Sequence, residues 1–459
     1  MSRIVDPTGA LTAGLAAIRS EFQVPAAFAA ETLAAAAEAA RRAPTEHIDR
    51  TALPFVTLDP ATSTDLDQAF AIQTAGADLI LNYAIADVAW FVPDDGPVDR
   101  EAWARGETLY LPDGKASLYP AAIGEAAASL LPDGPRPAIN LIVRIDPQGN
   151  ATLDGAERAI IRSRAKLAYD SVTPAGLPPE FPELARRIAA AEARRGAARV
   201  DPPEQEVAPL PGGGYELVFR PRLASEDNNA ALSLAANLAV AQALQAHHTG
   251  LFRVMPGPDK AAIARLRHTA RALRLDWPTG TPLAQFEQGL TAADPHQAAM
   301  MLAIRRAGQG ATYAPYADGV TPWHSAMAAT YAHATAPLRR LADRYVLRAT
   351  LEIANGRPVP EAVTQAFARL PKVMARADAL AGRVERAVLD LAEAVLLQPR
   401  IGETFAAIVT DSGDHGARFQ LRDLAVIARL GEDAAPGTAL DVRLSAVDLA
   451  MRSIRFERT

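Results

Sequence analysis

The distribution of apolar residues changes character twice along this chain, and these two changes constrain the fold more than any other feature. Residues 1–50 are rich in alanine and predict helices, notably over residues 27–42. From Pro54 onward, short apolar runs separated by turn residues predict strands. After Pro399-Arg400, strand-like runs return with glycines between them. We expect a multidomain α+β protein, because 459 residues exceed the roughly 250–300 residues that one hydrophobic core supports.

Hydrophobic patterning divides the chain into three expected regions. Strands are expected over residues 55–58, 69–72 and 79–85, with a hairpin of 138–145 and 151–164. Helices are expected over residues 182–199, 228–247, 259–275, 337–354 and 374–397. The expected regions are a short helical region (1–44), a mixed α/β domain (45–398) and a small β-barrel of OB-fold size (399–459).

Composition excludes several classes of protein. The chain has no cysteine, which excludes disulfide-linked partners, zinc–thiolate sites and thiol nucleophiles. No apolar run approaches the roughly 18 residues of a membrane span, and the first residues lack the apolar core of a signal peptide. We therefore expect a cytoplasmic protein with no membrane contact. The net charge of −6 argues against a passive nucleic-acid coat.

Three aspartates follow one predicted strand and precede the next. Asp59, Asp65 and Asp67 share this loop, and carboxylates that converge repel one another unless a cation lies between them. Hard oxygen ligands suit Mg²⁺, which takes one or two carboxylates together with substrate phosphate. The alternative is a solvated acidic turn without a ligand.

A basic segment at residues 331–343 complements the aspartates in charge. Pro337 suits the first position of a helix, which places Arg339 and Arg340 in a first turn where the helix dipole disfavours cations. Basic side chains beside free backbone N–H groups are typical of a phosphate site. The alternative is a surface pair between Arg339 and Asp343, four residues apart.

Taken together, these motifs resemble the RNB family of exoribonucleases, which includes ribonucleases II and R. The aspartate loop resembles the signature of the family, and Thr335–Arg340 with Asp343 resembles its Thr-Ser-Pro-Ile-Arg-Arg element. The final β region resembles the S1 domain that these enzymes carry. Further similar segments occur in the same order, at residues 85–88, 105–112, 163–172, 251–254 and 383–386.

This resemblance implies a monomeric, Mg²⁺-dependent enzyme that degrades single-stranded RNA processively from its 3′ end to nucleoside 5′-monophosphates, with Mn²⁺ as a substitute ion. Asp59, Asp65 and Gln68 are then expected to bind the metal, with Asp67 as a ligand that also orients the attacking water. Arg339 is expected to neutralise charge on the scissile phosphate.

The same resemblance assigns four residues to RNA binding. Tyr110 and Tyr169 are expected to stack on or border the terminal bases, although each alone also fits a half-buried strand aromatic. Arg340 is expected to contact RNA, and Glu385 to brace the site from a neighbouring helix.

The chain departs from the family pattern in several places. Gln68 stands where the family has a fourth aspartate, Ala336 replaces a serine, and Ala230-Ala231 occupy expected glutamate positions. The residues before the aspartate loop are too few for the two N-terminal cold-shock domains of the family, so we expect neither of them in this sequence. Residues 1–44 form either a helical clasp on the catalytic domain or a helix-turn-helix-like RNA-binding unit. These departures leave a second functional class open, a non-catalytic RNA-binding scaffold on the same fold.

Overall fold

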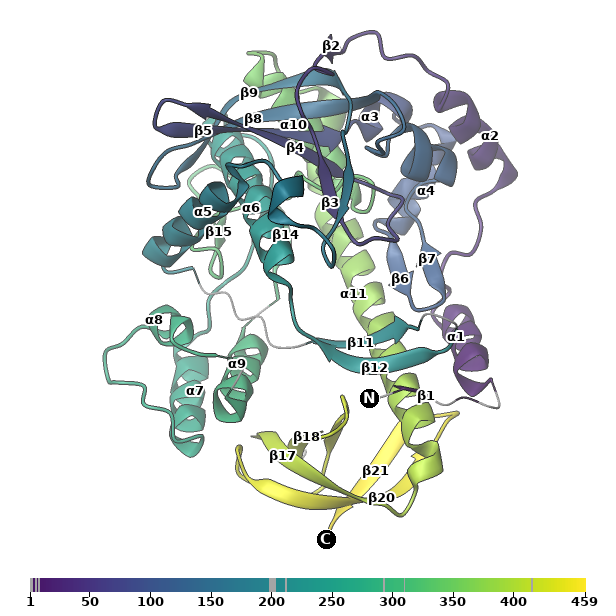
Figure 1. Ribbon diagram of the computed structural model, residues 1–459, viewed down its shortest axis with the longest axis vertical. Coiled ribbons are helices and arrows are strands. Elements are labelled where there is room, and N and C mark those ends of the chain that lie inside the picture. Colours follow the sequence, from purple (N-terminus) through teal and green to yellow (C-terminus); the bar gives the residue numbers. More distant parts are fainter. Residues whose placement is uncertain are drawn as a thin grey trace.

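The computed structural model describes the chain apart from residues 1–2, 5, 7–8, 198–203, 211–212, 292–293, 309 and 414–415. A mixed α/β region lies at one end of the long axis and a β-barrel at the other, and one long helix joins them (Figure 1). This arrangement confirms the predicted fold class. No helix in the described parts of the chain is both long and apolar enough to cross a membrane.

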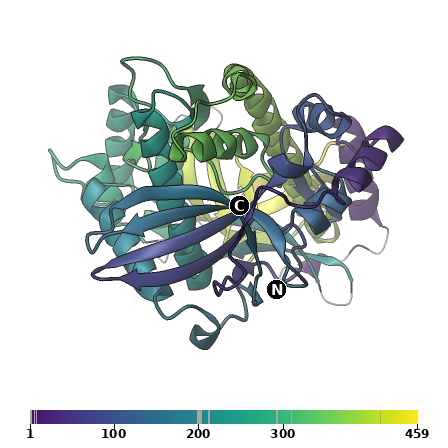
Figure 2. The same ribbon diagram turned by 90° about the horizontal axis from the view of Figure 1, so that it is seen from above.

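A five-stranded sheet forms the centre of the α/β region, and Figure 2 shows it from above. Its order is β2-β9-β8-β5-β4, antiparallel throughout except for the parallel β2–β9 pair. The strands expected between residues 55 and 164 from short apolar runs all lie in this sheet apart from the first. The strands of the sheet are β2 (Ile48–Asp49), which was not predicted, β4 (Gln68–Ala75), β5 (Asp78–Ala86), β8 (Arg136–Ile145) and β9 (Ala151–Ile161).

The first predicted strand, β3 (Thr57–Asp59), lies outside this sheet. It pairs in parallel with β10 (Lys166–Ala168), so that Asp59 lies opposite Ala168. The backbone N–H of the following residue, Tyr169, donates to the carbonyl of Asp59 at 3.2 Å. Two predicted site residues, 110 positions apart in the sequence, are therefore brought together where two short strands end.

Helices cover the sheet. α6 (Ala224–Ala246) and α10 (Leu341–Ala354) pack on β9, and α5 (Phe181–Arg195) packs beside α6. The ring of Phe181 stacks on that of Phe70 in the sheet, with centroids 5.4 Å apart. The predicted helices 182–199 and 228–247 are confirmed with shifted ends, although residues 198–199 lie outside the described part of the chain.

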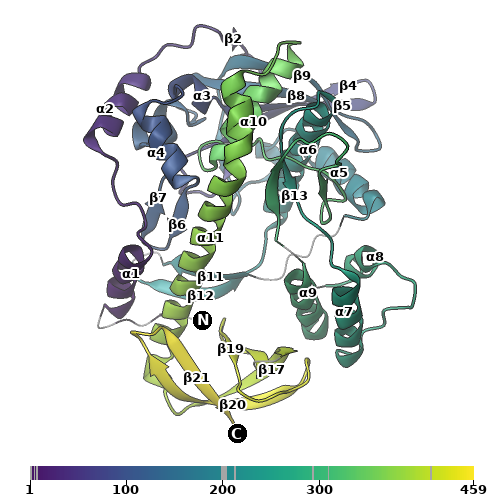
Figure 3. The ribbon, with the colours of Figure 1, turned by 180° about the vertical axis from the view of Figure 1, so that it is seen from behind.

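α11 (Glu361–Leu397) is the 37-residue helix that joins the two ends of the molecule, as Figure 3 shows from behind. It begins 13 residues before the predicted start at residue 374. Pro371, a residue type that normally interrupts a helix, lies inside it. A three-stranded sheet that was not predicted packs against it: β1 (Arg3–Ile4), β11 (Glu204–Pro209) and β12 (Tyr215–Arg220).

The two N-terminal helices brace different parts of the molecule. α1 (Ala10–Glu21) packs on α11, and a Cβ added to Gly14 would meet the Leu391 side chain at 2.5 Å, so the helices cross closely there. α2 (Ala30–Ala39) lies beside α4 (Pro97–Arg105). This arrangement favours the clasp over the helix-turn-helix alternative for residues 1–44.

The C-terminal strands form a nearly closed five-stranded barrel in the order β19-β18-β17-β20-β21. Phe405, Phe419 and Phe456 contact one another inside it, with ring centroids 5.3 and 6.0 Å apart, so these aromatic residues form its core. The strand bounds are β17 (Thr404–Gly413), β18 (Gly416–Leu421), β19 (Ile427–Arg429), β20 (Ala439–Asp448) and β21 (Ser453–Arg458). The last of these strands was not predicted.

Three further helices form a small unit with a hydrophobic cluster of its own. They are α7 (Lys260–Ala272), which confirms the predicted helix at 259–275, α8 (Leu283–Gln288) and α9 (Pro295–Ala307). Trp277 stacks on Phe286 within this unit at 4.6 Å between centroids. α9 contacts β17 of the barrel, so the unit lies against the barrel from the side opposite α1 (Figure 1).

Candidate active site

The acidic loop after β3 meets the basic segment before α10. The backbone N–H of Leu338 donates to Asp67 Oδ1 at 2.7 Å, and Arg339 Nε lies 3.4 Å from Asp67 Oδ2. Asp67 is 5% exposed, whereas the side chain of Arg339 is 46% exposed. The structure therefore joins a buried carboxylate to a guanidinium that still faces solvent.

Burial controls the protonation of two of the aspartates. It raises the pKa of Asp67 to about 7 and that of Asp59 to about 6, and the charge of Arg339 opposes both shifts. Asp65 adds a repulsive contribution that raises the pKa of Asp59 further. Near neutral pH these carboxyl groups take up and release protons readily, which suits a group that accepts a proton from water.

The predicted start of the helix at Pro337 is wrong. Residues 337–339 form a turn, α10 begins at Leu341, and Arg340 is its N-cap with an extended backbone. Backbone hydrogen bonds to residues 106–108 hold the segment instead: the N–H of Thr108 donates to the Arg339 carbonyl at 3.0 Å, and that of Leu341 to Gly106 at 2.9 Å. The helix dipole therefore does not position Arg339.

Gly106 allows this backbone pairing. It has a φ of +77°, and a Cβ there would meet Ala377 of α11 at 2.8 Å. A residue with a side chain would be strained by its backbone conformation and would collide with α11. The turn that carries Arg339 is thus fixed through Gly106 to the long helix.

Arg340 differs from Arg339 in its surroundings. Its guanidinium donates to both carboxylate oxygens of Asp343, from Nε at 2.9 Å and from Nη2 at 2.7 Å. Asp343 is fully buried and also accepts the backbone N–H of Ala336 at 2.8 Å. The alternative expectation paired Asp343 with Arg339, but the structure pairs it with Arg340. Arg339 therefore remains open to a ligand.

Asp65 is held by partners from a hairpin formed by β6 (Leu109–Leu111) and β7 (Gly114–Ala116). Lys115 Nζ lies 2.8 Å from Asp65 Oδ1 and 3.1 Å from Glu125, and the Tyr110 hydroxyl donates to Asp65 Oδ2 at 3.4 Å. Tyr110 is 57% exposed, so its ring is free for stacking. The sequence reasoning missed Lys115, although it is one of only four lysines in the chain.

Tyr169 borders the site from the end of β10. Its hydroxyl accepts a hydrogen bond from Asn229 of α6 at 2.9 Å, and the same amide group donates to the Leu58 carbonyl at 3.2 Å. Burial raises the pKa of Tyr169 to about 12, so the hydroxyl stays protonated. Asn229 therefore fixes both the tyrosine and the strand that ends at Asp59, and it was another residue that the sequence reasoning missed.

The loop between Asp59 and Asp65 is held by a lysine. Lys166 Nζ donates to the carbonyls of Ala61 at 2.8 Å and Ser63 at 2.5 Å. Its charge also favours the ionised form of Asp59. Lys166 therefore positions the aspartate loop, a role that the sequence did not reveal.

Gln68 has both ends of its amide engaged by the protein. Its Nε2 donates to the Thr335 carbonyl at 2.7 Å, and its Oε1 accepts the hydroxyl of Tyr83. Ser233 and Asn237 of α6 continue the network by bonding to the Thr335 hydroxyl at 2.8 and 3.4 Å. The expectation that Gln68 binds the metal does not agree with this geometry, which favours a brace between the Asp67 strand and the Arg339 segment.

The residues of the site fit a Mg²⁺ ion that is held by only a few protein ligands. Within the described residues, no three or more carboxylate or imidazole side chains are arranged as a metal cluster. Asp59 is half-buried and its carboxylate has no hydrogen-bonding or ionic partner among those residues, whereas the carboxylates of Asp65 and Asp67 each have two. Mg²⁺ often takes only one or two carboxylates and completes its shell with water and substrate phosphate. Asp59 is therefore the carboxylate most available to such an ion.

Glu385 lies apart from these residues. It is exposed on α11, and the described residues give it no hydrogen bond or ion pair. The structure supplies no contact through which it would brace the aspartates or Arg339.

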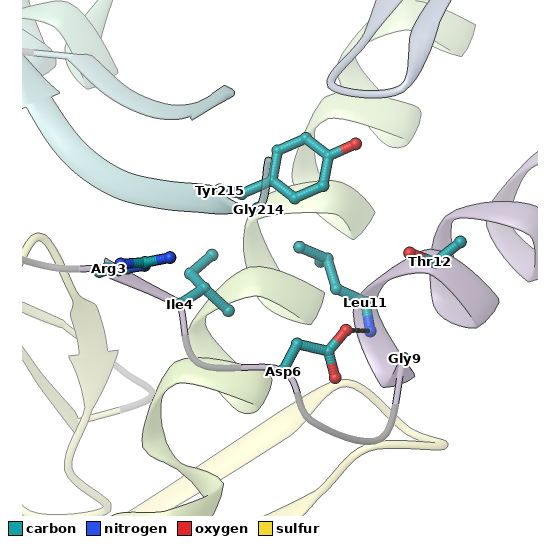
Figure 4. Close-up of a pocket in the computed structure, with 8 residues that line it drawn as sticks. All are labelled: Arg3, Ile4, Asp6, Gly9, Leu11, Thr12, Gly214 and Tyr215. Atoms are coloured by element: carbon teal, nitrogen blue, oxygen red, sulfur yellow. Dashed lines mark hydrogen bonds between the residues drawn. The ribbon is translucent and has the colours of Figure 1, made fainter. Parts of the chain in front are cut away.

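A pocket of about 630 Å³ lies near the N-terminus and is distinct from the aspartate site (Figure 4). Its one carboxylate, Asp6, accepts the backbone N–H groups of Ala10 and Leu11 at 2.7 and 2.8 Å. Asp6 thus caps α1, and the pocket walls are otherwise formed by β1, the start of α1 and the start of β12.

Comparison with known proteins is consistent with this site. Residues 47–355 match the RNB domain, and residues 403–459 match the RNase II-type exonuclease C-terminal S1 domain. The chain belongs to the RNB family.

Two of the similar proteins are ribonucleases. Ribonuclease R of Aquifex aeolicus is 26% identical over 385 residues, which cover 77% of this chain and 53% of that protein. The chain spans about half the length of the curated relatives it matches. The structure of Mycoplasma genitalium RNase R in complex with ribose-methylated single-stranded RNA superposes with a TM-score of 0.86 at 19% identity, over 98% of this chain and 78% of that one.

A third similar structure is that of yeast Ssd1, a pseudonuclease. It has a TM-score of 0.68 at 16% identity and covers 96% of this chain and 57% of its own. The fold alone therefore does not decide between a nuclease and an inactive relative.

Proposed function

We propose that the chain is a 3′→5′ exoribonuclease that hydrolyses single-stranded RNA processively to nucleoside 5′-monophosphates with the aid of Mg²⁺. The observation that carries this proposal is the pairing of the buried Asp67 carboxylate with the open guanidinium of Arg339. Beside this pair lies the carboxylate of Asp59, which has no hydrogen-bonding or ionic partner among the described residues. Membership of the RNB family and the single-stranded RNA bound by Mycoplasma genitalium RNase R support RNA as the substrate.

Each group has a chemical role in this proposal. Asp67, with a pKa near 7, orients the attacking water and accepts its proton. Arg339 neutralises the charge that builds on the phosphate oxygens, for which a planar fork of donors is well suited. Bound Mg²⁺ supplies Lewis-acid polarisation of the phosphate, and Asp59 with Asp65 would hold it.

Two tyrosines bind the terminal nucleotides in this proposal. Tyr110 offers an exposed ring beside Asp65, and Tyr169 offers a half-buried one beside Asp59. Base–aromatic stacking contributes roughly 1–3 kcal/mol per base and is insensitive to sequence, which suits an enzyme that proceeds along any strand.

Incubation of the purified chain with 5′-labelled 20-nucleotide RNA and Mg²⁺ tests the proposal. We expect products that shorten from the 3′ end, and a loss of about 10²–10⁴-fold in turnover for Asp67→Asn, the range associated with a general base. RNA affinity should stay within a few-fold. The matched control is Asp154→Asn, which makes the same chemical change in β9, where Asp154 forms an ion pair with Arg144. Unchanged turnover in Asp67→Asn would refute the assignment.

A second function, an RNA-binding scaffold without activity, is favoured by one observation. Gln68 replaces an acidic residue of the family pattern and directs its amide into the protein. In this case the wild-type chain would bind the labelled RNA but leave it intact in both Mg²⁺ and Mn²⁺.

A further inference from the structure

A lysine is held between two carboxylates at the edge of the aspartate site. Lys115 Nζ lies 2.8 Å from Asp65 Oδ1 and 3.1 Å from Glu125 Oε1. The other oxygen of Glu125 accepts the hydroxyl of Thr64 at 2.8 Å, so this carboxylate is tied to the aspartate loop as well. The ammonium therefore bridges two carboxylates, which is a position that a metal ion can take in an acidic site.

The hairpin that carries Lys115 is itself anchored to the N-terminal helices. Arg19 of α1 donates to both carboxylate oxygens of Asp113 at 2.7 and 3.0 Å, and to the carbonyl of the next residue at 3.2 Å. Tyr110 lies opposite Lys115 in the hairpin, and both side chains reach Asp65. Figures 1 and 3 show β6 and β7 next to α1. A braced element thus presents the lysine to the aspartate loop.

The charges of the site balance with one divalent ion. Among the described residues, four carboxylates and three cationic side chains interact there: Asp59, Asp65, Asp67 and Glu125 with Lys115, Lys166 and Arg339. When all of these groups are ionised, one net negative charge remains. One divalent ion changes it to one positive charge, which matches a single phosphodiester, whereas two ions would leave three positive charges. Charge balance therefore favours one ion beside the lysine.

We propose that the Lys115 ammonium is a resident cation of the aspartate site and occupies, between Asp65 and Glu125, the place that a second divalent ion would otherwise take. Nucleases with two divalent ions hold them about 3.5–4 Å apart. A lysine supplies a compact positive charge without taking up an ion from solution. The chain then binds one divalent ion, at Asp59, and in this respect the proposal rests on the proposed function. Lys115 is a positioning residue that acts through Asp65.

The number of bound ions tests the proposal without RNA. The metal-free chain is titrated with Mn²⁺, which suits the same oxygen ligands as Mg²⁺, and electron paramagnetic resonance counts the ions bound per chain. Lys115→Met removes the charge and keeps an unbranched stem, and Lys115→Arg keeps the charge. The matched control is Lys260→Met, at an exposed position in α7. Ions that Asp59→Asn still binds are subtracted as background on exposed carboxylates.

We expect the count to double in one variant only. The wild type, Lys115→Arg and Lys260→Met should each bind one Mn²⁺, and Lys115→Met should bind two, because two carboxylates are left without their cation. Adding Glu125→Gln to Lys115→Met should return the count to one, which locates the second ion. A role of Lys115 in folding alone would lower the melting temperature and leave the count unchanged.

Each outcome decides the proposal. Two ions in the wild type, one ion in Lys115→Met, or no ion in the wild type would each overturn it. Thermal melting in EDTA checks that each variant is folded, and Lys115→Gln, which keeps a polar end, replaces Lys115→Met if the latter does not fold. A wild-type chain that binds one Mn²⁺ but leaves RNA intact in Mg²⁺ would remove the proposed function and leave the role of Lys115 standing, so the two failures can be distinguished.

Discussion

The two ends of the molecule hold their charged groups in opposite ways. Around Asp67, the polar side chains are bonded to one another: Asp65 to Lys115, Gln68 to Tyr83, and Arg340 to Asp343. In the barrel, Arg418 lies between Arg429 and Asp411 on the neighbouring strands, and its buried Nε has no hydrogen-bond partner among the described residues. A bonded network fixes positions to a fraction of an ångström, as chemistry requires. A guanidinium donor without a partner leaves its side chain less tightly fixed than one held in such a network.

The sharpest test of this contrast uses the two adjacent arginines. Arg339→Gln should lower turnover by about 10²–10³-fold with little change in stability, because its fork is open and acts on the developing charge. Arg340→Gln should instead lower the free energy of unfolding by roughly 3–5 kcal/mol, since it leaves Asp343 buried without its partner. Turnover assays and denaturant titrations measure both. Similar losses of stability in the two variants would contradict the distinction.

The pH dependence of stability tests the bonded end without any substrate. The pKa of Asp67 is raised to about 7 by the fold, so its ionisation destabilises the native state. The contribution of Asp67 to the free energy of unfolding is fully present near pH 4 and should be lost as the pH rises through about 7. The loss should reach up to roughly 1.4 kcal/mol per pH unit.

Thermal melting of the metal-free protein between pH 4 and 8 measures this loss. The melting temperature of Asp67→Asn should fall less than that of the wild type, because asparagine keeps the acceptor for Leu338 but does not ionise. Added Mg²⁺ should restore the wild type at pH 8. Parallel curves for the two proteins would show that Asp67 is not the group responsible.

The Gln68→Asp substitution should change turnover less than the preceding variants. The direction of the change distinguishes a metal ligand from a structural brace. If Gln68 were a metal ligand, a carboxylate would lower the Mg²⁺ concentration for half-maximal rate. The hydrogen bonds to Thr335 and Tyr83 predict the opposite: the shorter acid cannot donate to the Thr335 carbonyl, and the rate should fall by roughly five- to thirty-fold for about 1–2 kcal/mol lost. Tyr83→Phe should show a milder loss. A lower Mg²⁺ requirement at an unchanged rate would restore the metal role.

Much of the fold could be predicted from the sequence, because the apolar runs of β4, β5, β8 and β9 are separated by clear turn residues and the site motifs occur in the family order. The parts that could not be predicted depend on contacts distant in sequence. Pro371 normally ends a helix, yet packing on both sides keeps α11 continuous through it. Lys115 and Tyr83 carry no local signal of their role, since each acts on a residue from another strand or loop.

The helix α11 also fixes the distance between the two ends of the molecule. Gly106, which carries the backbone of the Arg339 turn, touches it at Ala377, and Arg386, whose charge acts on Arg418 of the barrel, lies nine residues further along. At 1.5 Å per residue, these two levels are about 14 Å apart along the axis. A continuous helix keeps this separation constant, so a ligand shorter than this length can contact only one of the two levels at a time.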